Sequence, residues 1–286
     1  MPISIIIPTK NRPKSLVAAV KSARGAIPAG GEIIVVDDGS RIPAREALAG
    51  HVGAETTVID NLGQWGPSAA RNAGLKRTSQ PIVLFLDDDD LMISGYCQRV
   101  LRIARDHPDV TYGWTCFIQK RTGRRERPLP RPKHIVRTGK LDSTVPLRHK
   151  FARASGLWVR RGVLFRLGGF DESMRFGEDG ELCIRLVTTG NMWLEGEPGF
   201  IADDTDAKES ELLPPKCSRQ AFTWFRDMLD KHGDLLEEYD PWLERAYRRR
   251  MWKQWTRAQV RRLFNRSERG RPLPMKGTAR GQQDRH

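Results

Sequence analysis

The chain has 286 residues, 38% of them hydrophobic and 29% charged, with a formal net charge of +14 at pH 7, and it is long enough to bury one large core or two modest ones. We see no signal peptide before the first strand-like run and no hydrophobic run near the roughly 18 residues of a transmembrane helix, so no membrane span is expected in this sequence. The four cysteines are widely spaced, without a CxxC or Cys/His pattern, which excludes a typical zinc site and favours a reducing, cytoplasmic location.

The first third of the chain alternates strand-like and helix-like segments. The predicted strands are residues 3–8, 32–36, 56–59 and 82–86, mostly aliphatic runs typical of strands buried on both faces. The predicted helices between them are residues 13–25 and 67–76. Asn11 is expected to cap the first helix and Gly25 to end it. This alternation predicts an α/β fold with a parallel, doubly wound sheet.

Two of these strands end in acidic residues. Asp37 and Asp38 follow the second strand, and four consecutive aspartates, residues 87–90, follow the fourth. Because the carboxyl ends of parallel strands meet at one edge of the sheet, we expect both clusters at the edge where open α/β proteins bind ligands. The run of four is compatible with a divalent metal site, and also with Asp89 or Asp90 capping a helix that runs to about residue 107.

The remaining elements are less regular. Further predicted strands are residues 110–119 and 158–160, and further predicted helices are residues 161–167, 178–189, 222–231 and 242–264. Residues 120–133 contain three prolines and many arginines and are expected to form a loop. The chain beyond residue 265 is rich in glycine, proline and arginine and is expected to be disordered.

Positive charge is concentrated in two segments. Residues 119–153 contain twelve Lys and Arg against two acidic residues, and residues 241–286 contain fourteen against three, which leaves the rest of the chain mildly acidic. Such segments attract polyanions, among them anionic lipid headgroups, nucleic acid and phosphorylated substrates. The last predicted helix carries an apolar stripe among its arginines. It is expected to anchor the protein to an anionic membrane surface, or else to pack on the body of the protein, in which case it could still present its basic face to lipid. The stripe consists of Leu243, Tyr247, Met251 and Trp255.

Six short motifs follow one another along the chain. They are IPTKNR at 7–12, VDDGS at 36–40, SAARNAG at 68–74, LDDDD at 86–90, GGFDE at 168–172 and EDGELCIRL at 178–186. Each motif is weak alone, but in this order and spacing the series resembles the family 2 glycosyltransferases of the GT-A fold over about the first 200 residues. The resemblance implies a doubly wound, mostly parallel sheet flanked by helices, to which this chain adds C-terminal basic helices.

The resemblance also implies a nucleotide-diphospho-sugar donor, with UDP expected and GDP and dTDP left open. Pro8, Thr9 and Asp38 match the contacts to the base and the ribose. Arg71 matches a residue that faces the nucleotide, with a surface helix arginine as the alternative. Arg12 could approach the nucleotide too, or could equally be a solvated arginine. Asn72 and Gly74 are expected to be structural.

The acidic DxD motif of the family maps onto Asp87, Asp88 and Asp89. By resemblance Asp89 binds Mn²⁺ or Mg²⁺, Asp87 contacts the ribose or helps to hold the metal, and Asp88 belongs to the donor site, which leaves Asp90 as the expected helix cap. Carboxylate oxygens suit these hard cations, and a divalent cation stabilises the negative charge of a leaving diphosphate.

Asp179 matches the catalytic base of the family, with Glu178 the next candidate. An ionised carboxylate there would take the proton of the acceptor hydroxyl as it attacks opposite the diphosphate, which inverts the anomeric configuration. The alternative is that Glu178 and Asp179 only charge the first turn of a helix.

Many relatives place a histidine downstream of the base. The corresponding stretch here, residues 200–210, reads FIADDTDAKES and has none, which leaves the third protein ligand of the metal open. Candidates to replace it are Asp203, Asp204 and Asp206, which could equally be surface charges.

We therefore expect a catalytic domain over residues 1–235, with a nucleotide-binding half to 110 and an acceptor-binding half from 111, followed by a basic helical extension with a disordered tail over 236–286. The expected function is inverting sugar transfer to a hydroxyl of a glycan or lipid-linked acceptor in surface polysaccharide synthesis, peripheral on the inner face of the cell membrane. Two alternatives are an inactive relative acting as a scaffold and a basic nucleic-acid-binding protein, although no nucleic-acid-binding module is found and no such partner is expected.

Overall fold

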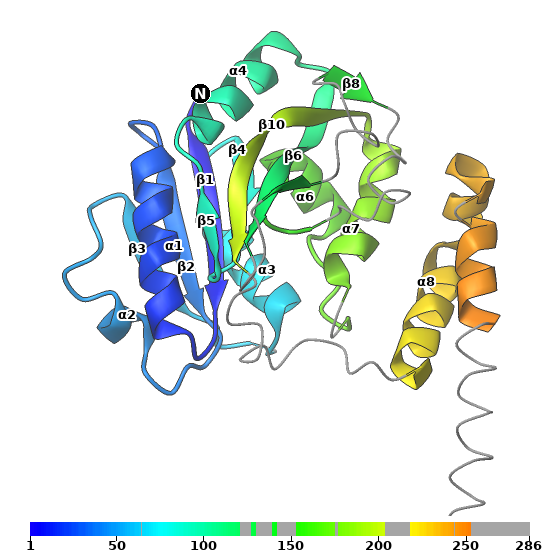
Figure 1. Ribbon diagram of the computed structural model, residues 1–286, viewed down its shortest axis with the longest axis horizontal. Coiled ribbons are helices and arrows are strands. Elements are labelled where there is room, and N and C mark those ends of the chain that lie inside the picture. Colours follow the sequence, from blue (N-terminus) through cyan, green and yellow to red (C-terminus); the bar gives the residue numbers. More distant parts are fainter. Residues whose placement is uncertain are drawn as a thin grey trace, which may run out of the picture.

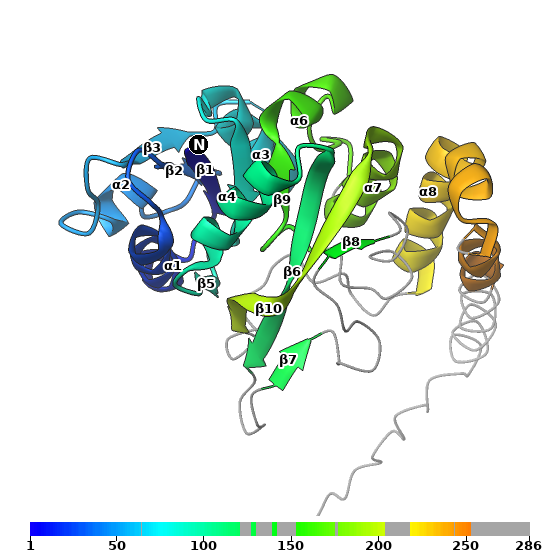
Figure 2. The same ribbon diagram turned by 90° about the horizontal axis from the view of Figure 1, so that it is seen from above.

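A mixed sheet, with ten strands among the described residues, runs through the protein and has helices on both of its faces (Figures 1 and 2). The computed structural model describes residues 1–63, 65–120, 127–129, 139–141, 153–174, 177–203, 218–242 and 244–252. The strand order is β3-β2-β1-β4-β9-β6-β10-β5, with β7 paired to β6 and β8 paired to β10. The strands are β1 (Ile3–Thr9), β2 (Glu32–Asp37), β3 (Thr56–Asp60), β4 (Ile82–Phe85), β5 (Asp90–Met92), β6 (Val110–Lys120), β7 (Arg127–Leu129), β8 (Gly139–Leu141), β9 (Trp158–Arg160) and β10 (Asn191–Asp203).

The helices divide the core into two layers. Side chains of α1 and α4 pack on one face of the sheet, and those of α3, α6, α7 and α8 pack on the other. In β1, Ile5 and Ile7 face the first layer and Ile6 faces the second, and all three are fully buried, as the aliphatic run predicts. The helices are α1 (Pro13–Ala26), α2 (Ala44–Ala47), α3 (Pro67–Arg77), α4 (Tyr96–Asp106), α6 (Arg161–Leu167), α7 (Glu178–Leu186) and α8 (Ser218–Tyr239), with a short 3₁₀ turn at Val187–Thr189.

The first four long strands form the predicted parallel unit. β1 pairs in parallel with β2 and β4, and β2 pairs in parallel with β3, so β1 lies at the centre. The close packing of α3 on this unit explains Gly74, because a Cβ there would lie 2.6 Å from a methyl carbon of Ile6. The expected structural role of Gly74 is confirmed.

The cap predicted for α1 is wrong. The residue that precedes the helix is Arg12, and no side chain caps it. Asn11 instead adopts a left-handed backbone with φ 58°, and its Oδ1 accepts a hydrogen bond from the backbone N–H of Arg41 at 2.8 Å. Asn11 therefore joins two loops at the edge of the sheet, and α1 ends at Ala26, one residue beyond Gly25.

The cap predicted at Asp89 or Asp90 is also wrong. Asp90 opens strand β5, which pairs antiparallel with β10, and α4 begins only at Tyr96, after Gly95 in a left-handed conformation. The expected helix start was placed too early because the partner of this three-residue strand, around Ala202, lies more than a hundred residues away and leaves no local signal.

The second half of the sheet is mixed. β9 lies antiparallel between β4 and β6, and β6 pairs in parallel with β10, so the predicted strands at 110–119 and 158–160 are confirmed. The loop expected over residues 120–133 contains strand β7, antiparallel to β6; for Arg127–Leu129 the expectation is wrong. Most of that basic segment lies outside the described residues.

Two C-terminal helical segments pack beside α7 (Figure 1). α8 is longer than predicted, bends at His232 and is followed by helical residues 241–242 and 244–252. Tyr247 is 4% exposed and packs with Met251 against the main core, so this helix packs on the body, as one of the two alternatives predicts. Trp255 and the tail expected to be disordered lie outside the described residues. No helix among the described residues has the length and hydrophobicity to cross a bilayer.

Candidate active site

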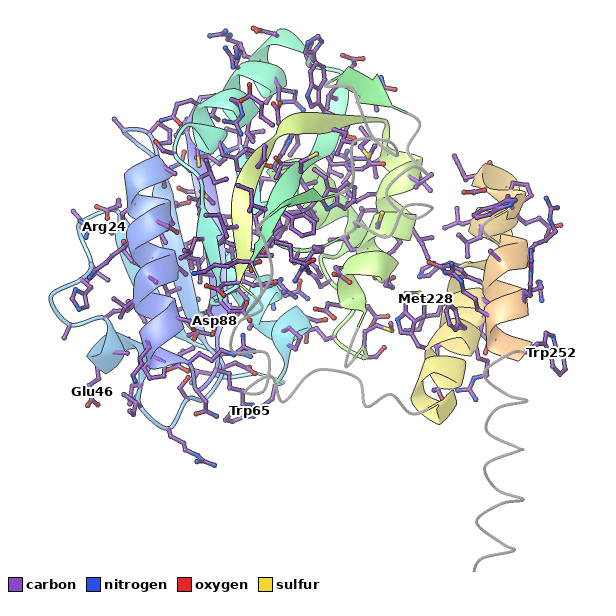
Figure 3. The ribbon with its side chains drawn as sticks, viewed as in Figure 1. Arg24, Glu46, Trp65, Asp88, Met228 and Trp252 are labelled. Carbon is purple, nitrogen blue, oxygen red and sulfur yellow. The ribbon has the colours of Figure 1, made fainter. Side chains whose placement is uncertain are left out.

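The predicted acidic residues meet at one edge of the sheet, around the end of β1 (Figure 3). Thr9 is the last residue of β1 and lies opposite Asp37 of β2 in the strand register. Asp37 holds the following turn, because its carboxylate accepts hydrogen bonds from the backbone N–H groups of Ser40 and Ala44 at 2.8 and 2.7 Å. The aspartates after β4 lie on the other side of β1.

Asp38 is buried and positioned by three donors. The side-chain amide of Asn61 donates to it at 2.7 Å, the backbone N–H of Gly66 donates at 3.0 Å, and the Lys10 ammonium lies 3.6 Å away. The carboxylate therefore has a fixed direction at the strand end, as a ribose or base contact requires. Its predicted contact with the donor stays a prediction.

Trp65 lies next to Asp38 and is not among the residues predicted from sequence. Its ring packs on Gly39, where a Cβ would come within 1.8 Å of the indole, and the Lys10 ammonium lies 4.9 Å from the ring centroid. The side chain is nevertheless 65% exposed (Figure 3). An exposed tryptophan beside the base and ribose candidate is well placed to meet a ligand, and a position just before the Gly66-Pro67 helix start was its only sequence signal.

Arg12 binds two aspartates of the run of four. Its Nη1 donates to Asp88 at 2.9 Å and to Asp89 at 2.7 Å, so the alternative of a solvated arginine is wrong. Asp88 also accepts a 2.7 Å hydrogen bond from the Thr9 hydroxyl. Burial raises the pKa of Asp88 to about 6, although Arg12 opposes the shift. Burial and the neighbouring Asp87 also raise the pKa of Asp89.

Arg71 lies between the acidic edge and α7. It is 4% exposed, and its two terminal nitrogens donate to Asp87 at 2.6 Å and to Glu178 at 2.7 Å. The alternative of a surface helix arginine is therefore wrong, while its contact with the nucleotide stays a prediction. Burial raises the pKa of Asp87, but Arg71 outweighs that effect and holds the pKa below its ordinary value.

Three of the four aspartates are arranged as a cation site requires. Asp87, Asp89 and Asp90 each place one carboxylate oxygen within 4.8 Å of the others. The Asp90 Oδ2 is buried and has no hydrogen-bond partner among the described residues, and burial together with Asp87 raises the pKa of Asp90 well above its ordinary value. This hard-oxygen set fits Mg²⁺ or Mn²⁺. Sequence reasoning assigned Asp90 to a cap and so missed it as a candidate ligand.

Asp179 lies at the start of α7, close to this edge. Its Oδ1 accepts a hydrogen bond from the backbone N–H of Gly180 at 2.8 Å. Burial and the adjacent Glu178 raise the pKa of Asp179 to about 7, although Arg71 opposes the shift. Glu178 is itself engaged with Arg71. Of the two carboxylates, Asp179 is therefore better suited to exchange a proton near neutral pH.

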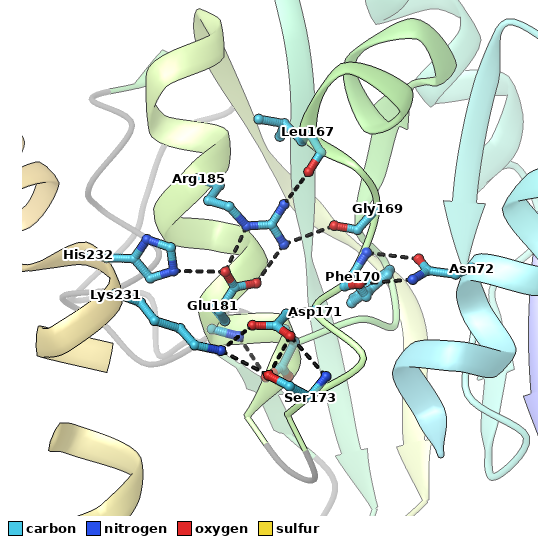
Figure 4. A network of polar contacts seen from close by, with 12 residues as sticks. Asn72, Leu167, Gly169, Phe170, Asp171, Ser173, Glu181, Arg185, Lys231 and His232 are labelled. Carbon is cyan, nitrogen blue, oxygen red and sulfur yellow. Dashed lines mark hydrogen bonds and ion pairs between the residues drawn. The ribbon is translucent and has the colours of Figure 1, made fainter. Parts of the chain in front are cut away.

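A polar network fixes the position of α7 (Figure 4). Glu181 is 1% exposed and accepts hydrogen bonds from Arg185 on α7 itself, and lies 2.8 Å from the His232 ring of α8. Arg185 also donates to the backbone carbonyls of Leu167 and Gly169, both at 2.8 Å. Burial raises the pKa of Glu181, but the His232 and Arg185 contacts outweigh it and lower the pKa.

Asn72 ties α3 to the loop before α7. Its side-chain amide donates to the Phe170 carbonyl at 2.8 Å and to Glu172 at 2.9 Å, and its oxygen accepts from the Phe170 backbone N–H at 2.8 Å (Figure 4). The expected structural role of Asn72 is confirmed. Of the candidate replacements for a downstream histidine, Asp203 is paired with Lys120 at 3.2 Å, and Asp204 and Asp206 lie outside the described residues.

Comparison with known protein families gives one match. The model described as "Glycosyl transferase family 2" matches residues 4–165. A pre-mycofactocin glycosyltransferase of Mycobacterium tuberculosis is 31% identical over 66% of this chain and 39% of its own length. The succinoglycan biosynthesis protein ExoU of Rhizobium meliloti is 31% identical over 66% of this chain and 57% of its own length.

A third relative shares a shorter segment. The GalNAc(5)-diNAcBac-PP-undecaprenol beta-1,3-glucosyltransferase of Campylobacter jejuni is 32% identical over 41% of this chain and 39% of its own length. In each of these three cases the match spans less than two thirds of the relative.

Two solved structures share the fold. TarS of S. aureus in complex with UDP-GlcNAc superposes with a TM-score of 0.67 at 17% identity, over 89% of this chain and 72% of TarS. The mannosyltransferase PcManGT of Pyrobaculum calidifontis, in complex with GDP-Man and Mn²⁺, gives a TM-score of 0.60 at 15% identity, over 96% of this chain and 76% of its own. The fold is GT-A, as the sequence resemblance implies.

Proposed function

The chain belongs to glycosyltransferase family 2, and from this membership and the geometry of its acidic edge we propose that it transfers a sugar from a nucleotide-diphospho-sugar to an acceptor hydroxyl, with inversion at the anomeric carbon. The observation that carries the proposal is the Asp87–Arg71–Glu178 chain of ion pairs, which joins one candidate cation ligand to the residue next to the candidate base. A donor and an acceptor bound at this edge would meet between them.

The donor is proposed to lie across the ends of β1, β2 and β4. Pro8, Thr9 and Asp38 would contact the base and ribose. Arg12 and Arg71 would hold the carboxylates that they bind in a fixed orientation. Asp87, Asp89 and Asp90 are the proposed ligands of Mn²⁺ or Mg²⁺, supported by their mutual approach. A cation held there would neutralise the charge that develops on the leaving diphosphate.

Asp179 is the proposed base. Its ionised carboxylate would accept the proton of the acceptor hydroxyl as the oxygen attacks the anomeric carbon from the side opposite the diphosphate. The pKa of about 7 supports this role, because a base with a pKa near the working pH combines a large ionised fraction with useful basicity.

For the substrates we propose a UDP-sugar donor and a glycan or lipid-linked acceptor. TarS was solved with UDP-GlcNAc and PcManGT with GDP-Man, which leaves a GDP-sugar as the second candidate. The name of the Campylobacter relative contains a PP-undecaprenol-linked glycan, and that of the Rhizobium relative a polysaccharide, which supports a lipid-linked acceptor and polysaccharide synthesis. A cytoplasmic protein at the inner face of the membrane would meet such an acceptor.

Calorimetric titration of nucleoside diphosphates, with Mn²⁺ and with EDTA, tests the donor site. We expect one nucleoside diphosphate to bind in the presence of Mn²⁺ and to lose nearly all affinity in Asp89→Ala, because that variant removes a proposed cation ligand at a solvated strand end. Asp106→Ala, an exposed carboxylate at the end of α4, is the matched control and should bind normally. Equal binding by Asp89→Ala and the wild type would contradict the cation assignment.

Turnover separates the proposal from an inactive scaffold. The scaffold alternative is supported if the protein binds the donor but releases no nucleoside diphosphate. The release is measured with hydroxyl acceptors and, for slow transfer of the sugar to water, without them. Donor binding that depends on Mn²⁺ separates the proposal from a nucleic-acid-binding protein.

A further inference from the structure

The helix formed by residues 241–252 presents one face to solvent that combines tryptophan and arginine. Trp242 and Trp252 are 52% and 58% exposed, and Arg245 and Arg249 between them are also exposed. The spacings of three, four and three residues place all four side chains on one side of an α-helix. We call these four residues the Trp/Arg face.

The opposite side of the same helix is held by the body of the protein. Tyr247 is buried with Met251 packed beside it, and the Tyr247 ring lies 5.7 Å from the ring of Trp224 and 5.3 Å from that of Phe225 on α8. These contacts fix the rotation of the helix about its axis. The Trp/Arg face is therefore held outward by contacts on the other side of the helix, and Figure 3 shows Trp252 pointing away from the body.

The Trp/Arg face differs in charge from the neighbouring α8. The exposed cations of α8, Arg226 and Lys231, are paired with carboxylates, and α8 also exposes Asp234, Glu237 and Glu238. The continuation of the chain, residues 253–286, contains ten Lys and Arg against two acidic residues. Its net charge is therefore positive, like that of the Trp/Arg face, so the two are not complementary in charge. An anionic partner is required by the charge, and an amphipathic one by the two exposed indoles.

We propose that the Trp/Arg face binds the surface of a membrane that contains anionic lipids. With a rise of 1.5 Å per residue, the two tryptophans lie about 15 Å apart along the helix axis, so both can enter one flat surface when the helix lies parallel to it. Indole rings favour the headgroup region, and arginines between them would pair with lipid phosphates. The inference rests on the proposed peripheral membrane location and assigns the surface that makes the contact.

The location of the face agrees with the proposed acceptor. In Figure 1 the helix lies at the end of the molecule away from β3 and α2, on the side of α7, whose first turn carries Asp179. Binding through this face would bring the half of the protein next to the base toward the membrane. A lipid-linked acceptor would then reach Asp179 from the membrane side, while the donor would reach the sheet edge from solvent.

Co-sedimentation with vesicles tests the assignment on the full chain. The vesicles contain phosphatidylcholine alone or with increasing phosphatidylserine, at low and high salt. We expect wild-type binding that rises with phosphatidylserine and falls with salt. The variant Arg245→Gln/Arg249→Gln should bind roughly tenfold or more weakly, since each basic residue at an anionic surface contributes about fivefold in affinity. Trp242→Ala/Trp252→Ala should also weaken binding, and its residual binding should be more sensitive to salt.

The matched control is Arg102→Gln/Arg166→Gln, which removes the same charge from exposed positions on α4 and α6. It should bind as the wild type does. An equal loss in this control, or full binding by Arg245→Gln/Arg249→Gln, would overturn the assignment of the face while leaving peripheral binding in place. The assignment would also be overturned if the protein bound single-stranded nucleic acid through the same arginines and did not bind vesicles. The face would then be a nucleic-acid-binding surface. Donor binding and turnover are measured separately, so sugar transfer can fail or stand without affecting this outcome.

Discussion

Asp179 and Arg71 show how single residues at this site depend on their surroundings. The two side chains come from different helices, yet Arg71 opposes the rise in the pKa of Asp179, and Arg71 is itself held by Glu178 and Asp87. The effect of a substitution at either residue should therefore be measured on both the rate of transfer and the free energy of unfolding.

Asp179→Asn should abolish most of the transfer without abolishing donor binding. The amide keeps the shape of the carboxylate but accepts no proton, so turnover should fall by roughly 10²-fold or more. Since the base is active when ionised and its pKa is about 7, wild-type kcat/KM should rise with pH below about 7 and level off above it. The variant should lack that rise. Near-normal turnover, or an unchanged pH profile, would assign the base elsewhere.

Arg71→Met should destabilise the protein. The substitution keeps most of the volume but leaves the half-buried Asp87 and the buried Glu178 carboxylates without their cation. Loss of one partner of a buried ion pair costs about 3–5 kcal/mol. Urea unfolding measures the change. Arg71→Lys is the control for charge, and it should restore only part of the stability because one ammonium cannot span both carboxylates as the guanidinium does. A loss below about 1 kcal/mol in Arg71→Met would contradict the proposed role.

At the scale of elements, the contact of α7 with α8 is the least predictable part of the site. Both helices were predicted, although α8 was expected only over residues 222–231. The network that joins them passes through Glu181, His232 and the pair of Lys231 with Asp171 (Figure 4). Because α7 carries Asp179, the C-terminal helices support the candidate base even though they contribute no residue to the sheet edge.

His232→Ala should loosen this contact. Removing the ring leaves the Glu181 carboxylate buried with Arg185 alone, and an unsatisfied hydrogen bond to a buried group costs about 1–3 kcal/mol. Thermal unfolding should show the loss, and hydrogen exchange should increase in α7 and α8 and not in β1 or β2. His51→Ala, a partly exposed histidine near α2, is the control. A uniform increase of exchange across the sheet would instead indicate global destabilisation.

For the whole molecule, the raised carboxylate pKa values predict an unusual pH dependence of stability. Asp88 and Asp179 have pKa values of about 6 and 7, well above an unfolded value near 3.8, so between these values the folded state binds more protons. The free energy of unfolding contributed by these groups should therefore increase as the pH falls from about 7.5 to 5. Below pH 4 the trend should reverse, since Asp171, with a pKa of about 2, loses its ion pair with Lys231 as it is protonated.

Thermal unfolding in EDTA over this pH range measures the effect. Asp88→Asn should flatten the part of the curve near pH 6, and excess Mn²⁺ at neutral pH should raise the melting temperature of the wild type by binding only the folded state. A melting temperature that decreases steadily from pH 7.5 to 5 would contradict the raised pKa values.

Local sequence determined the elements and the edge. The aliphatic runs of β1, β2 and β4 and the acidic residues that follow them predict a parallel sheet with carboxylates at one edge, because side-chain burial and strand direction follow from short segments. The order of six motifs gave the family and the GT-A fold. Asp38, Asp87, Asp89 and Asp179 all lie at the predicted edge or beside it, while their contacts with substrate stay predictions.

Only the tertiary structure decided which of these side chains act together. Arg71 reaches Asp87, 16 residues away, and Glu178, 107 residues away, and no local pattern shows that one buried guanidinium joins them. Asp90 became a candidate cation ligand instead of a helix cap because β10 pairs with β5 across more than a hundred residues. The rotation of the helix at 241–252, and with it the outward direction of Trp242 and Trp252, depends on aromatic contacts with α8. Sequence patterns report burial and direction within an element, whereas these features depend on pairing between elements that are far apart in the chain.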